Sequence, residues 1–238
     1  MRLKYLLLIL FVPFLLAGSN YYYGAVSSTV VTYEDFTTYT ESDEGSDIGI
    51  AENTITWTNL ESRRDTGIVY KDQGANYFDS DFTHQFVATV TARTSATIVS
   101  FWKIAGNIGD IVDLKTATNQ FTGVAFQYPN PEHRFILFSC EGSTWLDVYD
   151  VSSNITVGTT YYLTVSYDRD GGANGTGQFV CTIRTVSHTG TVFDTLTIDQ
   201  SAAKQHSGFR YNYVTSTYDD AANASTVSGT VSNLTLSP

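Results

Sequence analysis

The second half of the chain is a succession of short segments in which apolar and polar residues alternate, separated by Gly, Asn and Asp. Phe179, Cys181 and Ile183 occupy every second position of one segment, and Leu163 and Val165 do so in another. This period of two is typical of a β-strand that buries one face. Because turn residues recur at short intervals and helical periodicity is nearly absent, the pattern predicts an all-β protein, either a sandwich or a barrel.

The whole chain is expected to form about a dozen strands. Residues 107–119 are irregular and would hold a short helix or a loop within 108–115. No internal repeat and no linker divides residues 33–238, so we expect one domain there. A first strand could begin at 30–33, and 34–47 is expected to be a loop with a short strand. The other predicted strands cover residues 54–58, 67–70, 82–90, 96–104, 121–128, 134–139, 144–149, 161–167, 177–187, 192–198, 209–214 and 227–236.

The N-terminus has the layout of a secretory signal peptide. Arg2 and Lys4 precede an apolar run over residues 6–17, and small residues follow it. The run is shorter than the roughly 20 residues needed to cross a bilayer, although a retained anchor or a buried strand is the alternative. Ser19 stands where a lipoprotein box needs Cys, so lipid anchoring is not expected. We therefore predict a signal peptide at 1–19, an extended arm at 20–32, and a protein that is secreted or at the cell surface, without a membrane span after cleavage.

The chain is acidic. Lys and Arg total 13 against 24 Asp and Glu, a formal net charge of −11, and loss of residues 1–19 leaves 11 basic residues and a charge of −13. Such a surface repels phosphate backbones, which argues against nucleic-acid binding. It favours solubility and is compatible with divalent cations.

The two cysteines lie in predicted strands, Cys140 at the end of the strand that begins near residue 134 and Cys181 within 177–187. In an exported chain they could form one disulfide. Alternatively they are two separate buried thiols, since free Cys packs as a small hydrophobic residue. No second pair and no His cluster accompanies them, so they do not indicate a metal site.

In two parts of the chain, the succession of strand and hairpin segments resembles that of a known family. Segment 33–39 (YEDFTTY) leads to 54–58 (TITWT), and 160–165 (TYYLTV) is followed by a hairpin at 168–177, a strand at 179–183 and the closing 227–236 (VSGTVSNLTL). In this order the chain resembles the laminin-G-like branch of the concanavalin A-like lectin/glucanase superfamily. The resemblance implies two stacked antiparallel sheets in a jelly roll, a last strand that returns beside the first, and roles in binding glycans or surface proteins.

Catalytic motifs are missing. The glucanases of that superfamily carry Glu-x-Asp-x-(x)-Glu on one strand, which sets two carboxylates on one sheet face. Glu41, Asp43 and Glu44 have the wrong spacing, and Glu141 and Asp147 are six residues apart. No nucleophile elbow, zinc-protease motif or phosphate loop occurs, and the four His are scattered. We therefore expect no enzyme.

Trp145, Asp147 and Tyr149 alternate with Leu146 and Val148 along the predicted strand 144–149. If the two aliphatic residues face the core, the other three face outward. Aromatic rings can stack on sugar C–H faces while a carboxylate accepts hydroxyl hydrogens, so these three residues are the expected ligand-binding site. The alternative is that a loop covers this face and Trp145 only packs.

Other aromatic residues are expected in the core. Trp102 lies at the same parity as Ile98 and Ile104, and Trp57 at the same parity as Ile55. A further run, Phe209, Tyr211 and Tyr213, could extend an aromatic surface or form the inner face of an edge strand.

Oxygen-bearing side chains recur in the loop that starts at Asp168. Asp168, Asp170 and Asn174 surround two glycines and could bind Ca²⁺, or could simply favour hairpin geometry. The chain also contains glycosylation sequons at Asn154, Asn174, Asn223 and Asn233, which matter only where the host has the transferase.

Three functions follow, in order of preference. The first is a secreted, non-catalytic carbohydrate-binding or adhesion module whose partner is a glycan or surface glycoprotein. The second is a structural subunit of a cell-surface, filament or virion assembly that pairs with itself through the N-terminal arm. The third, a glycan-cleaving enzyme, conflicts with the missing carboxylate pair.

Overall fold

A computed structural model describes residues 31–94, 96–127, 132–141, 146–201, 208–221 and 225–237. Within it, Thr32–Pro238 is one compact unit. The predicted signal peptide and most of the predicted arm fall outside the described residues, so both stay predictions. Among the described residues, no helix combines the length and the apolar character that crossing a bilayer requires.

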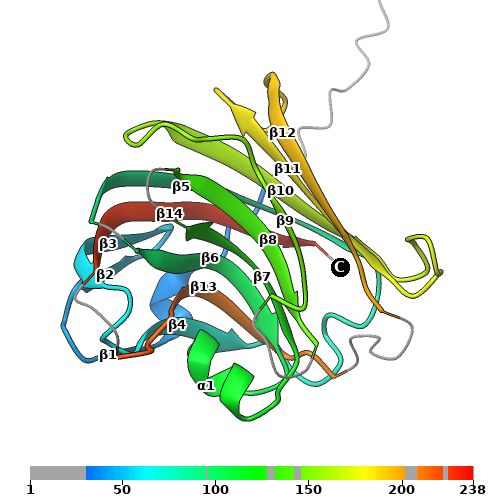
Figure 1. Cartoon of the computed structure of the whole chain (residues 1–238), viewed down its shortest axis with the longest axis horizontal. Helices are drawn as coiled ribbons and strands as arrows, with labels where there is room; N and C mark the ends of the chain where they lie inside the picture. Colours follow the sequence, from blue (N-terminus) through cyan, green and yellow to red (C-terminus); the bar gives the residue numbers. More distant parts are fainter. Residues whose placement is uncertain are drawn as a thin grey trace, which may run out of the picture. The chain divides into compact units, whose positions relative to one another are not determined.

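Two antiparallel seven-stranded sheets form a β-sandwich, as the alternating pattern predicted (Figure 1). We name each sheet after a central strand. In spatial order the β6 sheet contains β1 (Thr40–Asp43), β4 (Gly67–Asp72), β13 (Tyr211–Thr217), β6 (Ile98–Ala105), β7 (Phe121–Gln127), β8 (Arg134–Cys140) and β9 (Val148–Val151). The β5 sheet contains β12 (Val192–Asp199), β11 (Gln178–Thr185), β10 (Thr160–Asp168), β5 (Phe82–Arg93), β14 (Thr226–Ser237), β3 (Thr54–Glu61) and β2 (Ile48–Ala51).

The last strand returns beside an early one, as expected. β14 lies between β3 and β5 in the middle of the β5 sheet, and Val231 pairs with Ile55 of β3. The segment before β1 also joins this region, because Glu34 N–H donates to the Leu234 carbonyl at 2.8 Å. The short 3₁₀ helix η1 (Phe36–Thr38) follows, with Asp35 as its N-cap.

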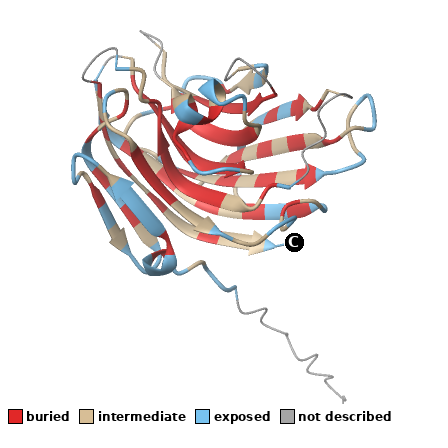
Figure 2. Ribbon diagram, turned by 90° about the horizontal axis from the view of Figure 1, so that it is seen from below, coloured by how far each residue is buried: buried red, intermediate tan, exposed pale blue. Residues whose placement is uncertain are grey.

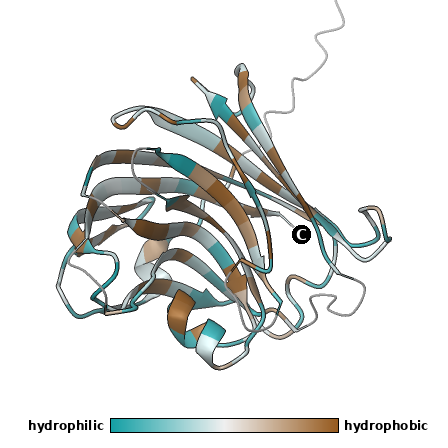
Figure 3. Cartoon of the chain, in the orientation of Figure 1, coloured by the Kyte–Doolittle hydropathy of each residue, from teal (hydrophilic) through white to brown (hydrophobic). Residues whose placement is uncertain are grey.

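The main core lies between the sheets. The strands β10 and β11 of the β5 sheet show the predicted alternation, since Leu163, Val165, Phe179, Cys181 and Ile183 are all fully buried. Bands of different hydropathy alternate along these strands in Figure 3. Their neighbours in sequence are partly exposed, which follows from one buried face and one open face.

Both tryptophans of the described residues lie in this core, as predicted. The Trp57 ring stacks on Phe101 with 5.3 Å between centroids, and its Nε1–H donates to Thr215 Oγ1 at 2.9 Å. Trp102 Nε1–H donates to His84 Nδ1 at 3.1 Å. Each indole therefore satisfies its one donor inside the core.

Ile98 does not share the face of Trp102, contrary to the expectation. A bulge between Ser100 and Trp102 changes the register against β7. Because one extra residue reverses the side-chain alternation, Ile98 joins a second apolar cluster on the outside of the sheet, while Trp102 and Ile104 face the core.

That second cluster makes the centre of the β6 sheet buried on both faces (Figure 2). It includes Ile68, Phe121, Ile136 and Phe138 on the outer face, together with Ile111 and Leu114 of the helix α1 (Ile111–Thr116). The helix begins inside the stretch predicted as helix or loop, 108–115, and ends one residue beyond it. Asp110 caps its N-terminus by accepting the Asp113 N–H at 2.7 Å.

Candidate functional site

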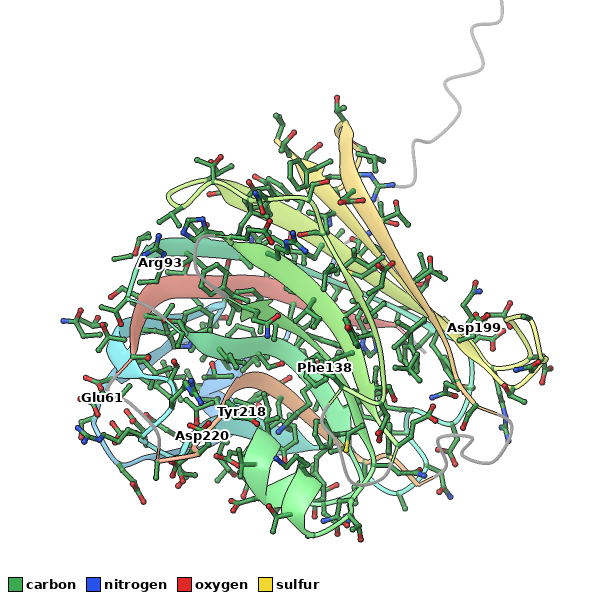
Figure 4. The ribbon with its side chains drawn as sticks, viewed as in Figure 1. Glu61, Arg93, Phe138, Asp199, Tyr218 and Asp220 are labelled. Carbon is green, nitrogen blue, oxygen red and sulfur yellow. The ribbon has the colours of Figure 1, made fainter. Side chains whose placement is uncertain are left out.

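Six residues form a row straight across the outer face of the β6 sheet, set by strand register. Tyr213 pairs with both Tyr70 and Lys103, and further pairs continue through Gly123 to β8 and β9. Paired residues of neighbouring strands share a face, so all six lie on one side of the sheet. The outer row is Tyr70, Tyr213, Lys103, Gly123, Phe138 and Tyr149, and Figure 4 labels its fifth member, Phe138.

Lys103 is the charged member of the outer row and is fully buried. Its Nζ donates to the Gly109 carbonyl at 2.9 Å and to Ser216 Oγ at 2.7 Å, and it lies 3.9 Å from the centroid of the Tyr213 ring. Burial lowers the pKa of Lys103 to about 7, although the negative charges of Asp110 and Asp113 act in the opposite direction. The ammonium is therefore held by two neutral acceptors and an aromatic face.

The segment 106–119 covers this part of the row. The Tyr213 hydroxyl donates to the Asn107 carbonyl at 2.8 Å and accepts the Gly109 N–H at 3.2 Å. Asp110 is buried and accepts the Asp219 N–H at 2.9 Å, and burial raises the pKa of its carboxyl. Because the cover is bonded to Lys103, Tyr213 and the chain at Asp219, a ligand has no access to the Lys103 amine.

The row becomes accessible at its β9 end. Tyr149 is 55% exposed, lies opposite Phe138, and points away from the core as predicted. Asp147 is also exposed, and its Oδ2 accepts the Glu141 N–H at 2.7 Å. Trp145, the third residue of the predicted surface, lies outside the described residues. The structure thus provides an exposed ring and an exposed carboxylate two residues apart.

The strand around these residues is shorter than predicted. β9 begins at Val148, so Asp147 precedes it. Val148 packs against the main core, whereas Leu146 packs against the outer cluster. The expectation that both aliphatic residues face the core was therefore wrong for Leu146, because regular strand alternation does not extend back to it.

The predicted calcium residues lie at the end of β10. Asp168 Oδ1 accepts the Asp170 N–H at 3.1 Å, which is ordinary turn bonding, and Asn174 is exposed further along the loop. Within the described ranges, no three His, Cys, Asp or Glu side chains are grouped closely enough to hold a metal ion. Calcium binding stays a prediction.

The cysteines are free thiols in separate clusters. Cys140 belongs to the outer cluster of the β6 sheet and Cys181 to the main core, so the disulfide alternative does not match this structure. Burial raises the pKa of the Cys181 thiol, which makes it inert. Of the sequons, Asn154 and Asn174 are exposed, Asn233 is partly buried, and Asn223 lies outside the described residues.

Sequence reasoning missed Lys103. It also left open on which face of the sheet Phe209, Tyr211 and Tyr213 lie. Tyr211 and Tyr213 pack with the outer cluster, while Phe209 lies in the main core. A usable signal for Lys103 was present, since it is the single charge in the otherwise uncharged strand 98–105. Charged residues are rarely fully buried, so a lone charge in such a strand marks a special environment.

Comparison with known proteins gives the fold. No protein-family model matches the chain, and no curated protein sequence matches it either. Among solved structures, the chain is similar to a double mutant of alginate lyase Aly36B in complex with an alginate tetrasaccharide. The sequence identity is 14%, the match covers 85% of this chain and 87% of the lyase, and the TM-score is 0.54.

Lectins are similar to the same extent. A legume lectin-like domain from Entamoeba histolytica has 11% identity, covers 84% of this chain and 89% of its own, and gives a TM-score of 0.55. Lectin UEA-II complexed with galactose has 10% identity, and the match covers 87% of this chain and 97% of the lectin, with a TM-score of 0.53. The chain therefore has the concanavalin A-like jelly-roll fold that these lectins and the lyase share, and nothing distinguishes a laminin-G-like branch within it.

Proposed function

We propose that this protein is a non-catalytic carbohydrate-binding protein that acts outside the cell, and that Tyr149 and Asp147 form part of its ligand surface. The observation that carries the proposal is the 55% exposure of Tyr149 at the end of a row whose Phe138, Lys103 and Tyr213 are buried. An exposed ring can stack on a sugar, and the adjacent carboxylate can accept hydroxyl hydrogens. Trp145 would extend this surface.

The fold occurs in both lectins and an alginate lyase, so the fold alone does not decide whether the protein is an enzyme. Two observations support a non-catalytic role. The glucanase carboxylate motif is missing from the sequence. In addition, the cation of the outer row, Lys103, is sealed beneath residues 106–119, so it cannot exchange a proton with a bound glycan.

A glycan array with the wild type, Tyr149→Ala and Tyr33→Ala tests the proposal. Tyr33 is the matched control, because it is 42% exposed and lies outside the outer row. We expect the wild type and Tyr33→Ala to bind the same glycans and Tyr149→Ala to lose at least tenfold in affinity. The free energy of unfolding of Tyr149→Ala should differ from that of the wild type by less than about 0.5 kcal/mol, as for most surface substitutions.

Equal binding by all three proteins would contradict the role of Tyr149, and binding to no glycan would contradict the function. Incubation of the array hits with the wild type should leave their chain length unchanged. Shortened products would show instead that the protein is a glycan-cleaving enzyme.

A further inference from the structure

A groove of about 440 Å³ lies on the opposite side of the sandwich, on the outer face of the β5 sheet. It is located where β5 begins, β10 ends, β11 begins and β14 ends, near the loop that follows β10 (Figure 1). Figure 4 marks this end of the molecule by Asp199, whose Oδ1 accepts the Gln178 Nε2–H at 2.7 Å. Gln178 is one of the residues that line the groove.

The floor of the groove is set by strand register. Thr83 pairs with Ser237 of β14 and with Ser166 of β10, and Ser166 pairs with Val180 of β11. These four residues therefore form a second row, across four strands, and all four line the groove. Because regular strands carry it, the floor presents hydroxyl groups and one aliphatic surface in a fixed arrangement.

Two carboxylates lie at the end of this floor. Asp81 Oδ1 accepts the Arg169 N–H at 2.8 Å, and Asp168 Oδ1 accepts the Asp170 N–H at 3.1 Å. Backbone bonds thus orient both carboxylates. The second oxygen of each has no hydrogen-bond partner among the residues that the structure describes, and the same holds for the hydroxyls of Thr83 and Ser166.

The groove offers acceptors and no positive charge. No Lys, Arg or His is among its lining residues, and the guanidinium of nearby Arg169 donates elsewhere, to the Asp79 carbonyl at 2.6 Å. An anionic ligand would meet two carboxylates, and the guanidinium of Arg169, whose charge acts on the lining residue Tyr167, is already bonded to Asp79. A ligand rich in hydroxyl or ammonium donors would pair with them and could place a C–H face on Val180.

We propose that this groove is a second saccharide-binding site, specific for neutral or amino sugars and closed to uronic acids. It is separate from the Tyr149 surface, on the other sheet, and does not depend on it. Asp168, which the sequence suggested as a calcium ligand, is instead a hydroxyl or ammonium acceptor at this site.

Nuclear magnetic resonance titration of the ¹⁵N-labelled protein with glucose, galactose, glucosamine and glucuronic acid tests the proposal. We expect at least one of the first three sugars to shift the amide signals of Thr83, Ser166 and Val180, and glucuronic acid to leave them unchanged. Tyr149→Ala should titrate like the wild type, which separates this site from the proposed function.

Val180→Arg should fill the groove and weaken binding at least tenfold. Val87→Arg is the matched control, since Val87 is also half-buried on the outer face of the β5 sheet but does not line the groove. Should Val180→Arg fail to fold, Asp168→Asn serves in its place and should weaken glucosamine binding at least fivefold.

The proposal is overturned if none of glucose, galactose and glucosamine binds, or if glucuronic acid binds more tightly than they do. It is also overturned if Val180→Arg binds these sugars with the affinity of the wild type. Calcium chloride alone, with a chelator control, completes the experiment. Shifts in this region with Ca²⁺ and with none of the sugars would identify a cation site and also overturn it.

Discussion

Lys103 brings a positive charge into a region where most neighbours are apolar or aromatic. An unpaired buried charge is expensive, and in general such a group lowers that cost by losing its proton. The two acceptors of Lys103 are a carbonyl and a hydroxyl, and the nearest charges, on Asp110 and Asp113, offset the burial only in part. The Lys103 side chain therefore connects the segment 106–119 to the sheet through its hydrogen bond to Gly109. Its positive charge, however, lowers the stability of the folded protein.

The pH dependence of unfolding checks this account. The folded pKa of Lys103, about 7, is below its ordinary value near 10.4, so the unfolded chain binds more protons between these limits. Stability should therefore rise with pH between about 7.5 and 9.5. Lys103→Met, which retains the length and removes the charge, should flatten that rise and be at least as stable as the wild type at pH 7.

Urea unfolding at three pH values in this window measures the effect. Lys115→Met is the control, because Lys115 is only half-buried on α1 and its change should leave the slope as it is in the wild type. The window ends below pH 10, where tyrosines begin to titrate and would add a fall in stability of their own. A Lys103→Met protein with the full wild-type slope would contradict the assignment.

At the scale of elements, the edge strands β9 and β12 close one side of the sandwich. Asp150 of β9 accepts the Thr197 N–H at 2.9 Å, and Asp194 of β12 accepts the Ser153 N–H at 2.7 Å. A carboxylate of β9 thus satisfies a backbone donor of β12, and a carboxylate of β12 satisfies a backbone donor just after β9. This reciprocal pair protects both edges from pairing with another chain.

The Asp194 half of this pair should be sensitive to acid. Burial raises the pKa of Asp194, but the N–H groups of Ser153 and Thr195 outweigh it, and the net direction is down. A depressed carboxyl pKa contributes stability that is present above the unfolded value near 3.9 and is lost as the pH falls through the folded value. Asp194→Asn should therefore lower stability at pH 7 by about 1 kcal/mol and should reduce the loss of stability on acidification.

Chemical unfolding at pH 7 and pH 3 compares Asp194→Asn with Asp170→Asn. Asp170 is exposed and is the control for loss of one negative charge. If both variants lose the same stability at pH 7, the carboxylate of Asp194 has no special role in joining the sheets.

The elements also show how far the sequence could lead. Strands that bury one face, such as β10 and β11, follow the period of two and were predicted well. The strands β6, β7 and β8 bury both faces, so their patterns carry no information about which side chain faces which layer. The bulge after Ser100 reverses the faces and leaves no mark in the composition.

The candidate site was predictable only in part for the same reason. Local alternation placed Tyr149 outward, as observed. The other members of the outer row lie on strands distant in sequence, and only their register brings Lys103 beside Tyr213. The groove depends in the same way on four strands, one of them the last of the chain. Long-range pairing of this kind is not encoded in a local pattern.

At the scale of the whole molecule, the closing strand β14 holds the β5 sheet together. It lies between β3 and β5 and pairs with both, and it buries Val227, Val231 and Leu234. Since the strand is central, its loss would divide the sheet and leave two strands with unpaired edges. The chain therefore cannot complete its fold until its last dozen residues are in place.

Deletion of residues 228–238 should consequently abolish cooperative unfolding and solubility. It removes Val231 and Leu234 from the core, and each large buried side chain costs about 2–5 kcal/mol. Unpaired backbone groups of β3 and β5 add to that loss, and the total approaches the 5–15 kcal/mol typical of an entire domain. Deletion of residues 237–238 alone is the control, because Ser237 is exposed at the end of the strand, and it should melt within a few degrees of the full chain. A soluble protein that lacks residues 228–238 and melts like the full chain would show that the sandwich closes without its central strand.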